Sequence, residues 1–205
     1  MPGRVFLTDP PDVIAATLGE VVAPIADEKP RYNIAPGQEV VALTVAGLTR
    51  MRWGMIPVGR VNARGRPVMK TIVNARSETV FDKSAFAGVG RAVLPVNGWY
   101  EWTGEKGQKT PHAVLSNSNE NTLWFAGLAS RWDELLTCTI MTRAANADVA
   151  DIHHRMPVIL NLDERELWLS DSDQVQDLGS DARLQDHQVR SFGVRDDGPE
   201  LIEPF

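Results

Sequence analysis

The 205-residue sequence contains a single cysteine and no long uninterrupted hydrophobic run. One cysteine excludes an internal disulfide and a metal site built from several cysteines, and such usage is typical of reducing compartments. The start lacks the basic segment and apolar core of a secretion signal, and no later run is long enough to span a membrane. We therefore expect a cytoplasmic protein that does not enter a membrane.

An excess of positive charge is also missing. The sequence has 21 Lys and Arg against 27 Asp and Glu, a net charge of −6. This balance argues against a protein that coats nucleic acid through bulk charge, but a local basic groove is still allowed, because phosphates respond to the nearby field. Arginines gather in the first half of the chain and acids crowd the tail from Asp163 onward, so the charge is unevenly distributed.

What the sequence does contain is a series of apolar segments typical of strands. Strands are predicted at 40–47 and 48–57 as a hairpin, 68–73, 91–102, 112–132 as a hairpin turning at 118–121, 137–144 and 188–194. Shorter segments predict helices at 9–19, 77–86, 145–154 and 163–170. Asp9 is the predicted cap of the first helix, and Gly19 its end. We predict one α+β, predominantly β domain over residues 1–205, with short helices around a β-rich core.

Two short segments carry polar groups beside apolar strands. Asn74 to Thr79 follows a predicted strand and opens a predicted helix, where backbone N–H groups can bind anions; alternatively, Asn74 and Ser77 only cap the helix and Arg76 is solvated. Glu101 lies among three aromatic residues in GWYEW, so its carboxylate is expected to be desolvated, with a raised pKa suited to proton transfer. A surface glutamate on an alternating strand is an equally good interpretation.

Two further segments are weaker signals. His153 and His154 precede an arginine and an apolar strand, and a histidine there can exchange protons near neutrality or simply cap a helix end. The pair lacks the spacing of helical zinc sites and a nearby carboxylate cluster, so no metal site is expected. The loop at 31–38 is rich in turn residues, and it can be interpreted either as a functional loop or simply as a connection between elements.

Together these segments resemble the SRAP family, the SOS-response-associated peptidases, which includes abasic-site processing proteins. The matching strings span residues 31 to 160 and are RYNIAPGQ, RWGMIP, NARSET, LPVNGWYEW, AGLASRW, TIMTRAAN and IHHRMPVIL, with MPGR as a partial match at the start. The resemblance implies a compact β-rich fold and a basic groove for single-stranded DNA containing abasic sites. It also implies no cofactor, a monomeric state, and association with the nucleoid when DNA is bound.

The resemblance further implies a reaction at the N-terminus. In the family the initiator methionine is removed, and a cysteine at position 2 reacts with the ring-opened aldehyde of an abasic site. Its amine forms a Schiff base and its thiol closes a thiazolidine. Carried over by motif, Asn74 positions the N-terminal residue or the sugar, Glu101 moves protons, and His153 activates or protonates the sugar oxygen.

The resemblance also assigns DNA contacts. Arg4, Arg76 and Thr142 are the candidates for phosphate contact, while Asn33 and Trp53 line the groove. Arginines hold phosphates without reading sequence, and an exposed tryptophan offers a stacking surface for an unpaired base.

Position 2 departs from the family, because it is Pro2 and not cysteine. Without a terminal thiol, no thiazolidine can form. Three accounts are open: the Pro2 secondary amine forms an iminium and the strand is cut by β-elimination; the chain binds DNA without durable chemistry; or Pro2 is an artificial replacement of a natural cysteine. We rank abasic-site chemistry first, a catalytically degenerate single-stranded DNA-binding module second, and a protease acting on other proteins third.

Overall fold

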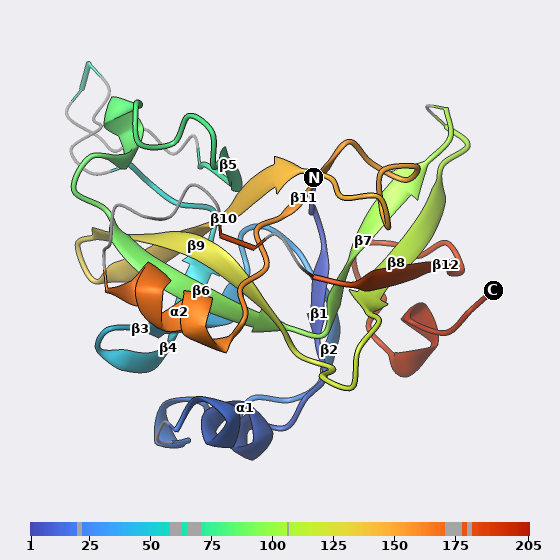
Figure 1. Ribbon diagram of the computed structural model, residues 1–205, viewed down its shortest axis with the longest axis horizontal. Coiled ribbons are helices and arrows are strands. Elements are labelled where there is room, and N and C mark those ends of the chain that lie inside the picture. Colours follow the sequence, from blue (N-terminus) through green and yellow to red (C-terminus); the bar gives the residue numbers. More distant parts are fainter. Residues whose placement is uncertain (20–21, 58–62, 65–70, 106, 171–177, 180–181) are drawn as a thin grey trace.

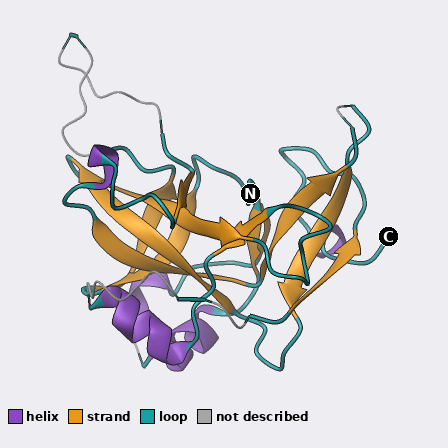
Figure 2. Cartoon of the chain, turned by 45° about the horizontal axis from the view of Figure 1, so that its top comes forward, coloured by secondary structure: helices purple, strands orange, loops and turns teal. Residues whose placement is uncertain are grey.

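The computed structural model describes residues 1–19, 22–57, 63–64, 71–105, 107–170, 178–179 and 182–205. Within these residues the strands form two sheets that lie side by side (Figures 1 and 2). The larger sheet consists of β11 (Arg155–Pro157), β10 (Leu135–Ala144), β4 (Gly47–Trp53), β3 (Glu39–Thr44), β6 (Gly90–Val96) and β9 (Leu123–Trp132), with β5 (Asn74–Arg76) paired to β10. The smaller sheet has the order β12 (Leu184–Gln188), β8 (Thr110–Ser116), β7 (Gly98–Thr103), β1 (Val5–Leu7) and β2 (Arg31–Ile34). The predicted α+β, predominantly β class is confirmed.

The larger sheet closes on itself. Strand β10 pairs with β4 on one side and with β9 on the other, while β4, β3, β6 and β9 pair in sequence. Each of these five strands therefore has neighbours on both sides, which is the arrangement of a barrel. Its strands contribute fully buried apolar side chains to the main core, among them Trp53, Phe125 and Ile140.

Along the strands of the smaller sheet, successive side chains belong alternately to two apolar clusters. Trp99 and Val114 face the main core, whereas Phe6, Tyr100 and Ala113 belong to a second cluster that the C-terminal residues cover. Because successive residues of a strand point to opposite faces, Glu101 lies on the Trp99 face of β7 and Trp102 on the Tyr100 face.

The helical segments are short, as expected. Among the described residues these are α1 (Pro11–Leu18), α2 (Leu162–Leu169) and the 3₁₀ turns η1 (Ala23–Ile25), η2 (Ser84–Phe86) and η3 (Pro199–Leu201). Gly19 ends α1 with φ +66°, as predicted, but Pro10 and not Asp9 is the N-cap residue. The Asp9 carboxylate accepts a hydrogen bond from Thr122 instead. A capping box between Asn161 and Glu164 begins α2.

Two predicted helices are wrong. Residues 77–86 form turns and η2, and residues 145–154 form turns. In the second segment Asn146 donates to the Ala182 carbonyl, and Asp148 accepts from the Leu184 N–H. Such short segments are marginal as helices, so contacts with the chain leading into β12 decide their shape.

The predicted hairpin over 112–132 is also wrong. Its two halves are strands, but β8 pairs with β7 and β12 in the smaller sheet, while β9 pairs with β6 and β10 in the barrel. The turn-rich connection therefore crosses from one sheet to the other. The last strand, β12, ends at Gln188, the first residue of the predicted range 188–194, so that prediction is wrong. The first half of the predicted strand 68–73 lies outside the described residues.

The N-terminus lies where the two sheets approach each other (Figure 1). Strand β1 pairs with β7, which carries Glu101, and β5 and β11 flank β10, where they pair with Thr142 from opposite sides. Three strand ends from distant parts of the sequence therefore surround the first residues. No helix among the described residues is long and apolar enough to cross a membrane.

Candidate functional site

The terminal amine is held between two titratable side chains. The Met1 nitrogen lies 2.9 Å from Glu101 Oε1 and 2.9 Å from His153 Nε2. The Met1 side chain is 47% exposed, whereas that of Glu101 is 7% exposed. The amine is thus open to solvent on one side and faces a buried carboxylate on the other.

Asn74 fixes the next residue. Its Nδ2 donates a hydrogen bond of 2.9 Å to the carbonyl oxygen of Pro2, which is itself buried. Asn74 begins β5, and its parallel pairing with Ile140 of β10 brings it to the chain end. The structure therefore brings Pro2, Asn74, Glu101 and His153 together, although 152 positions separate Met1 from His153.

Glu101 is a desolvated carboxylate. Burial raises its pKa above the ordinary value, and the Met1 ammonium and the Trp99 indole oppose that shift. The burial expected from the GWYEW segment is confirmed. A carboxyl group whose pKa is moved toward neutrality can both accept and return a proton at working pH.

His153 is supported by the backbone of Arg155. Its Nδ1 lies 2.9 Å from the Arg155 N–H nitrogen and 3.2 Å from the Arg155 carbonyl oxygen. Either neutral tautomer therefore finds a partner: Nδ1 accepts from the N–H, or Nδ1–H donates to the carbonyl. Nε2 can accordingly donate a proton to a bound group or accept one without movement of the ring. Burial lowers the pKa of His153, and the neighbouring ammonium lowers it further.

Burial also lowers the pKa of the Met1 amine below 8.0, and Arg155 contributes to the decrease. The Glu101 carboxylate acts in the opposite direction. A larger fraction of this amine is neutral near pH 7 than for an ordinary terminus, and the neutral form is the nucleophile.

The sequence reasoning missed an ion pair behind the site. Arg155 Nη1 and Nη2 lie 2.5 Å and 2.9 Å from the two Glu78 oxygens, and Nη2 also donates to the Thr142 carbonyl at 2.6 Å. This pair ties the segment after β5 to β11 and thereby holds the backbone that orients His153. Both residues stand in strings that carried the resemblance, NARSET and IHHRMP, and that was the available signal.

The predicted DNA contacts divide into buried and accessible residues. Trp53 is fully buried and donates its indole N–H to the Val73 carbonyl, so it offers no surface to a base. Thr142 is fully buried and donates to the Ala75 carbonyl. Asn33 is 7% exposed and donates to the carbonyls of Gly193 and Asp196. The structure thus assigns these three side chains to internal packing, since burial and fold contacts occupy them.

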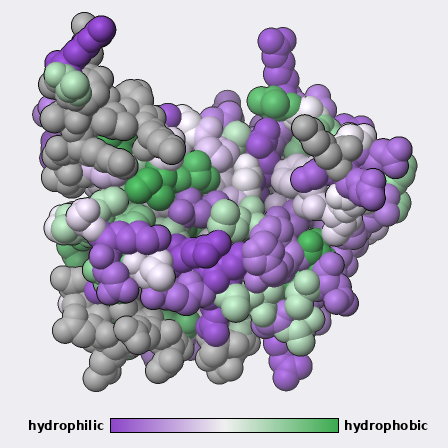
Figure 3. All heavy atoms as spheres, turned by 90° about the horizontal axis from the view of Figure 1, so that it is seen from above, coloured by the Kyte–Doolittle hydropathy of each residue, from purple (hydrophilic) through white to green (hydrophobic). Residues whose placement is uncertain are grey.

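Arg4 and Arg76 remain accessible. Arg76 is exposed at the end of β5, and Arg4 is half-buried with its Nε donating to Asn33 Oδ1. Arg4 is three positions after Met1, and Arg76 is two positions after Asn74, which binds the Pro2 carbonyl. The face seen in Figure 3 carries many hydrophilic side chains among apolar ones. A strand of anionic phosphates reaching the terminal amine would meet these two cations.

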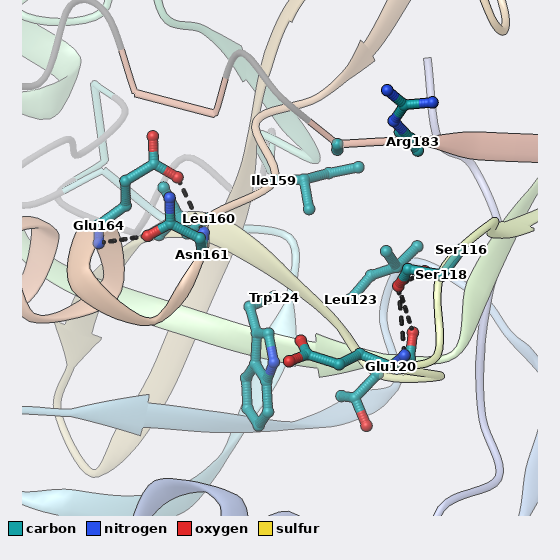
Figure 4. A pocket seen from close by; sticks show the side chains of 12 residues that line it. Ser116, Ser118, Glu120, Leu123, Trp124, Ile159, Leu160, Asn161, Glu164 and Arg183 are labelled. Atoms are coloured by element: carbon teal, nitrogen blue, oxygen red, sulfur yellow. Dashed lines mark hydrogen bonds between the residues drawn. The ribbon is translucent and has the colours of Figure 1, made fainter.

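A separate pocket of about 300 Å³ lies between the start of α2 and the connection from β8 to β9 (Figure 4). Of its charged groups, Glu164 is engaged with the fold, because it completes the capping box and also accepts from the Gly179 N–H. Neither Glu101 nor His153 lines it. The described residues include no group of three His, Cys, Asp or Glu side chains that could hold a metal. Burial raises the pKa of the Cys138 thiol to about 12, so this cysteine is no nucleophile.

Comparison with known proteins agrees with this geometry. A family model described as SOS response associated peptidase (SRAP) matches residues 1–196. The chain is 32% identical over 197 residues to the abasic site processing protein YobE of Bacillus subtilis, with 88% of each chain covered. It is 30% identical over 193 residues to the abasic site processing protein HMCES of Gallus gallus, which covers 77% of this chain and 57% of that one.

Solved structures share the fold. A protein from Bacteroides thetaiotaomicron superposes with a TM-score of 0.83 at 22% identity, covering 98% of this chain and 99% of the other. One from Bordetella bronchiseptica gives a TM-score of 0.70 at 22% identity, covering 93% and 100%. At this identity the likeness concerns the fold alone.

Proposed function

The chain belongs to the SOS response associated peptidase (SRAP) family, and from this premise we propose that it processes abasic sites in single-stranded DNA through its N-terminal amine. The observation that carries the proposal is the terminal nitrogen 2.9 Å from both a buried carboxylate and an imidazole. Relatives at about 30% identity are named abasic site processing proteins, which supports the same substrate class.

The proposed chemistry begins at the ring-opened sugar, whose C1 is an aldehyde. The neutral amine adds to C1, Glu101 takes the proton that the nitrogen loses, and loss of water from the carbinolamine leaves an iminium. The imidazolium form of His153 donates its Nε2 proton to the departing oxygen and becomes the neutral tautomer whose Nδ1–H faces the Arg155 carbonyl. The free Nε2 of that tautomer then accepts a proton from the site without a change of ring position.

The residue that carries the amine decides the product. Removal of Met1 would expose the secondary amine of Pro2, and its iminium acidifies C2 of the sugar. Loss of the C2 proton expels the 3′ phosphate, and hydrolysis releases the free amine. With no terminal thiol the iminium is transient, so we propose strand cleavage in place of a lasting crosslink.

Borohydride trapping tests this proposal. The full chain, with its N-terminal residue determined by mass spectrometry, is mixed with a single-stranded oligonucleotide holding one abasic site. We expect a reduced covalent adduct at the first residue and cleaved strand in its absence. An adduct on Pro2 identifies the Pro2 iminium, whereas an adduct on retained Met1 assigns the reaction to the methionine amine.

A second candidate, binding without chemistry, is favoured by Pro2 in place of the family's cysteine. Intact affinity for the abasic oligonucleotide with neither adduct nor cleavage would establish it and overturn the catalytic proposal. In either case affinity should fall as the salt concentration rises. The slope of log affinity against log salt should correspond to a few phosphate contacts. A salt-insensitive complex would contradict phosphate contacts by Arg4 and Arg76.

A further inference from the structure

An open pocket of about 560 Å³ lies on the other face of the smaller sheet from Glu101. It is lined by Arg4, Trp102, Gly107, Lys109, Ser191 and Phe192. Trp102 follows Glu101 directly in β7, so the alternation of the strand directs the two side chains to opposite faces. The pocket is therefore adjacent to the reaction site around the rim of the sheet.

Aromatic rings form one wall of this pocket. The ring centroids of Trp102 and Phe192 are 5.8 Å apart, and Phe192 lies 4.7 Å from Tyr100. Trp102 and Phe192 are partly exposed, unlike Trp53, so their rings are accessible to a planar ligand. The hydroxyl of Tyr100 donates to the Tyr32 carbonyl, which leaves this ring fixed at the base of the wall.

Two cations complete the pocket. Arg4 and Lys109 form no ion pair with a carboxylate in the part of the chain that the structure describes. The nearby Asp196 and Asp197 carboxylates are engaged, since they accept from the Gly193 and Tyr32 N–H groups. A surface that combines exposed aromatic rings with unpaired cations fits an unpaired base and its phosphate.

Arg4 connects the pocket with the reaction site. It follows Met1 to Gly3 directly, and its carbonyl accepts from the Tyr100 N–H, so this residue lies where the chain enters β1. A DNA strand attached at the terminal nitrogen can cross Gly3 and Arg4 to reach the Trp102 face. An ideal Cβ placed on Gly3 meets no atom within 4 Å, so the crossing point is uncrowded.

We propose that this pocket binds the nucleobase next to the abasic site, stacked on Trp102 and Phe192, with its phosphate at Arg4 and Lys109. The proposal rests on the proposed function, because the lesion at the amine sets which base reaches the pocket. It requires the DNA strand to bend around the start of β1. The contribution of Phe192 and Ser191 gives the C-terminal segment a role in DNA binding.

Fluorescence of 2-aminopurine tests the proposal. The base analogue is placed on the 5′ or the 3′ side of the abasic site in two otherwise identical oligonucleotides. We expect the full chain to quench the analogue at one of these positions. Phe192→Leu, which keeps an apolar side chain but removes the ring, should reverse most of the quenching and weaken affinity about fivefold. Phe205→Leu is the matched control, because Phe205 is 84% exposed and lines none of the described pockets.

Lys109→Gln provides an independent variant, since Lys109 is exposed and its replacement should leave the fold intact. It should reduce the slope of log affinity against log salt by about one unit. Equal fluorescence at both positions with and without protein, or quenching and salt slopes unchanged by both variants, would overturn the pocket assignment. Displacement of the quenched oligonucleotide by equimolar free deoxyadenosine monophosphate would also overturn it, because the pocket would then be a mononucleotide site.

The two proposals fail separately. If borohydride traps no adduct but Phe192→Leu still restores the fluorescence, the chemistry is wrong and the pocket assignment holds. If trapping proceeds normally while neither position is quenched, the pocket assignment is wrong and the chemistry holds.

Discussion

Two imidazoles lie near Glu101, and their nitrogens are used in opposite ways. His112 stands directly across from Glu101 in the pairing of β7 with β8, and its Nδ1 and Nε2 bind Asp186 at 2.9 Å and Thr103 at 3.1 Å. His153 Nδ1 contacts the Arg155 backbone, and the terminal amine lies 3.1 Å from Nδ1 and 2.9 Å from Nε2. The hydroxyl of Thr103, the imidazole of His112 and the carboxylate of Asp186 therefore tie three strands together, whereas the His153 imidazole faces the terminal amine and is suited to chemistry.

Of the variants considered, Glu101→Gln should slow the reaction at the N-terminus most. The amide keeps the shape of the side chain but cannot take the proton that the amine loses, so trapping should slow by about 10²–10⁴-fold. Affinity for the abasic oligonucleotide should change by less than about threefold. The matched control is Asp186→Asn, which removes the carboxylate from the His112 region and should leave trapping unchanged. Equal loss of trapping and binding in Glu101→Gln would contradict a role in proton transfer.

His153→Gln should slow trapping by about 10²-fold, because it removes the proton donor on the other side of the amine. A flattened dependence of the trapping rate on pH would accompany the loss. The rate is followed at saturating oligonucleotide so that changes in binding do not enter. If His112→Gln lowers the rate as much as His153→Gln does, the assignment of the reaction to His153 and not to His112 is wrong.

Glu78→Gln tests the residues that support His153 from behind. Arg155 would keep its charge without a carboxylate partner, and its positive charge already lowers the pKa of both His153 and the Met1 amine. We expect a lower His153 pKa by NMR titration and trapping slower by about tenfold. Glu134→Gln is the control, because Glu134 pairs with Arg131 on the exposed turn between β9 and β10. An unchanged His153 titration would exclude a positioning role for Glu78.

The amine itself should titrate below pH 8.0 while Met1 is retained, since burial dominates its pKa. Glu101→Gln should lower this pKa further, because the carboxylate stabilises the ammonium form. NMR titration of the Met1 signals in protein labelled at methionine measures both values. A pKa above 8.0 in the unsubstituted chain would mean that the carboxylate outweighs desolvation.

His112→Gln should have the smallest effect on chemistry. Trapping should stay within about twofold, whereas loss of two hydrogen bonds that join β7, β8 and β12 should cost about 1–2 kcal/mol of unfolding free energy. Urea denaturation gives the second value. A large loss of trapping with unchanged stability would place His112 in the reaction.

Much of the fold follows from local pattern. The strands from Glu39 to Trp53, the helix ended by Gly19 and the helix begun by Asn161 each carry a periodicity or cap that is visible in the sequence. The secondary-structure predictions were wrong where contacts with distant parts of the chain determine the local conformation. Residues 145–154 have helical composition, but Asn146 and Asp148 bind the chain before β12. The connection after β8 has hairpin composition, although its strands belong to different sheets.

The candidate site also has features that were visible in the sequence and features that were not. The strings around Asn74, Glu101 and His153 pointed to segments that the structure brings together at the N-terminus, because a polar residue beside an apolar strand is recognisable by itself. Trp53 was misplaced as a groove residue, since aromatic character does not tell an exposed ring from a barrel core. Arg155 and Glu78 were missed because an ion pair between residues 77 positions apart has no local signature.

By itself the sequence determined the β-rich class, the family resemblance and the absence of a terminal thiol, because these depend on residue identity and short spacing. Only the tertiary structure decided that the terminal amine meets Glu101 and His153, and that Trp102 and Phe192 share a pocket near Arg4. The physical reason is that the strands bearing these residues pair across the whole length of the chain. Such pairing is fixed by the closure of the barrel and the burial of its core, which no short segment encodes.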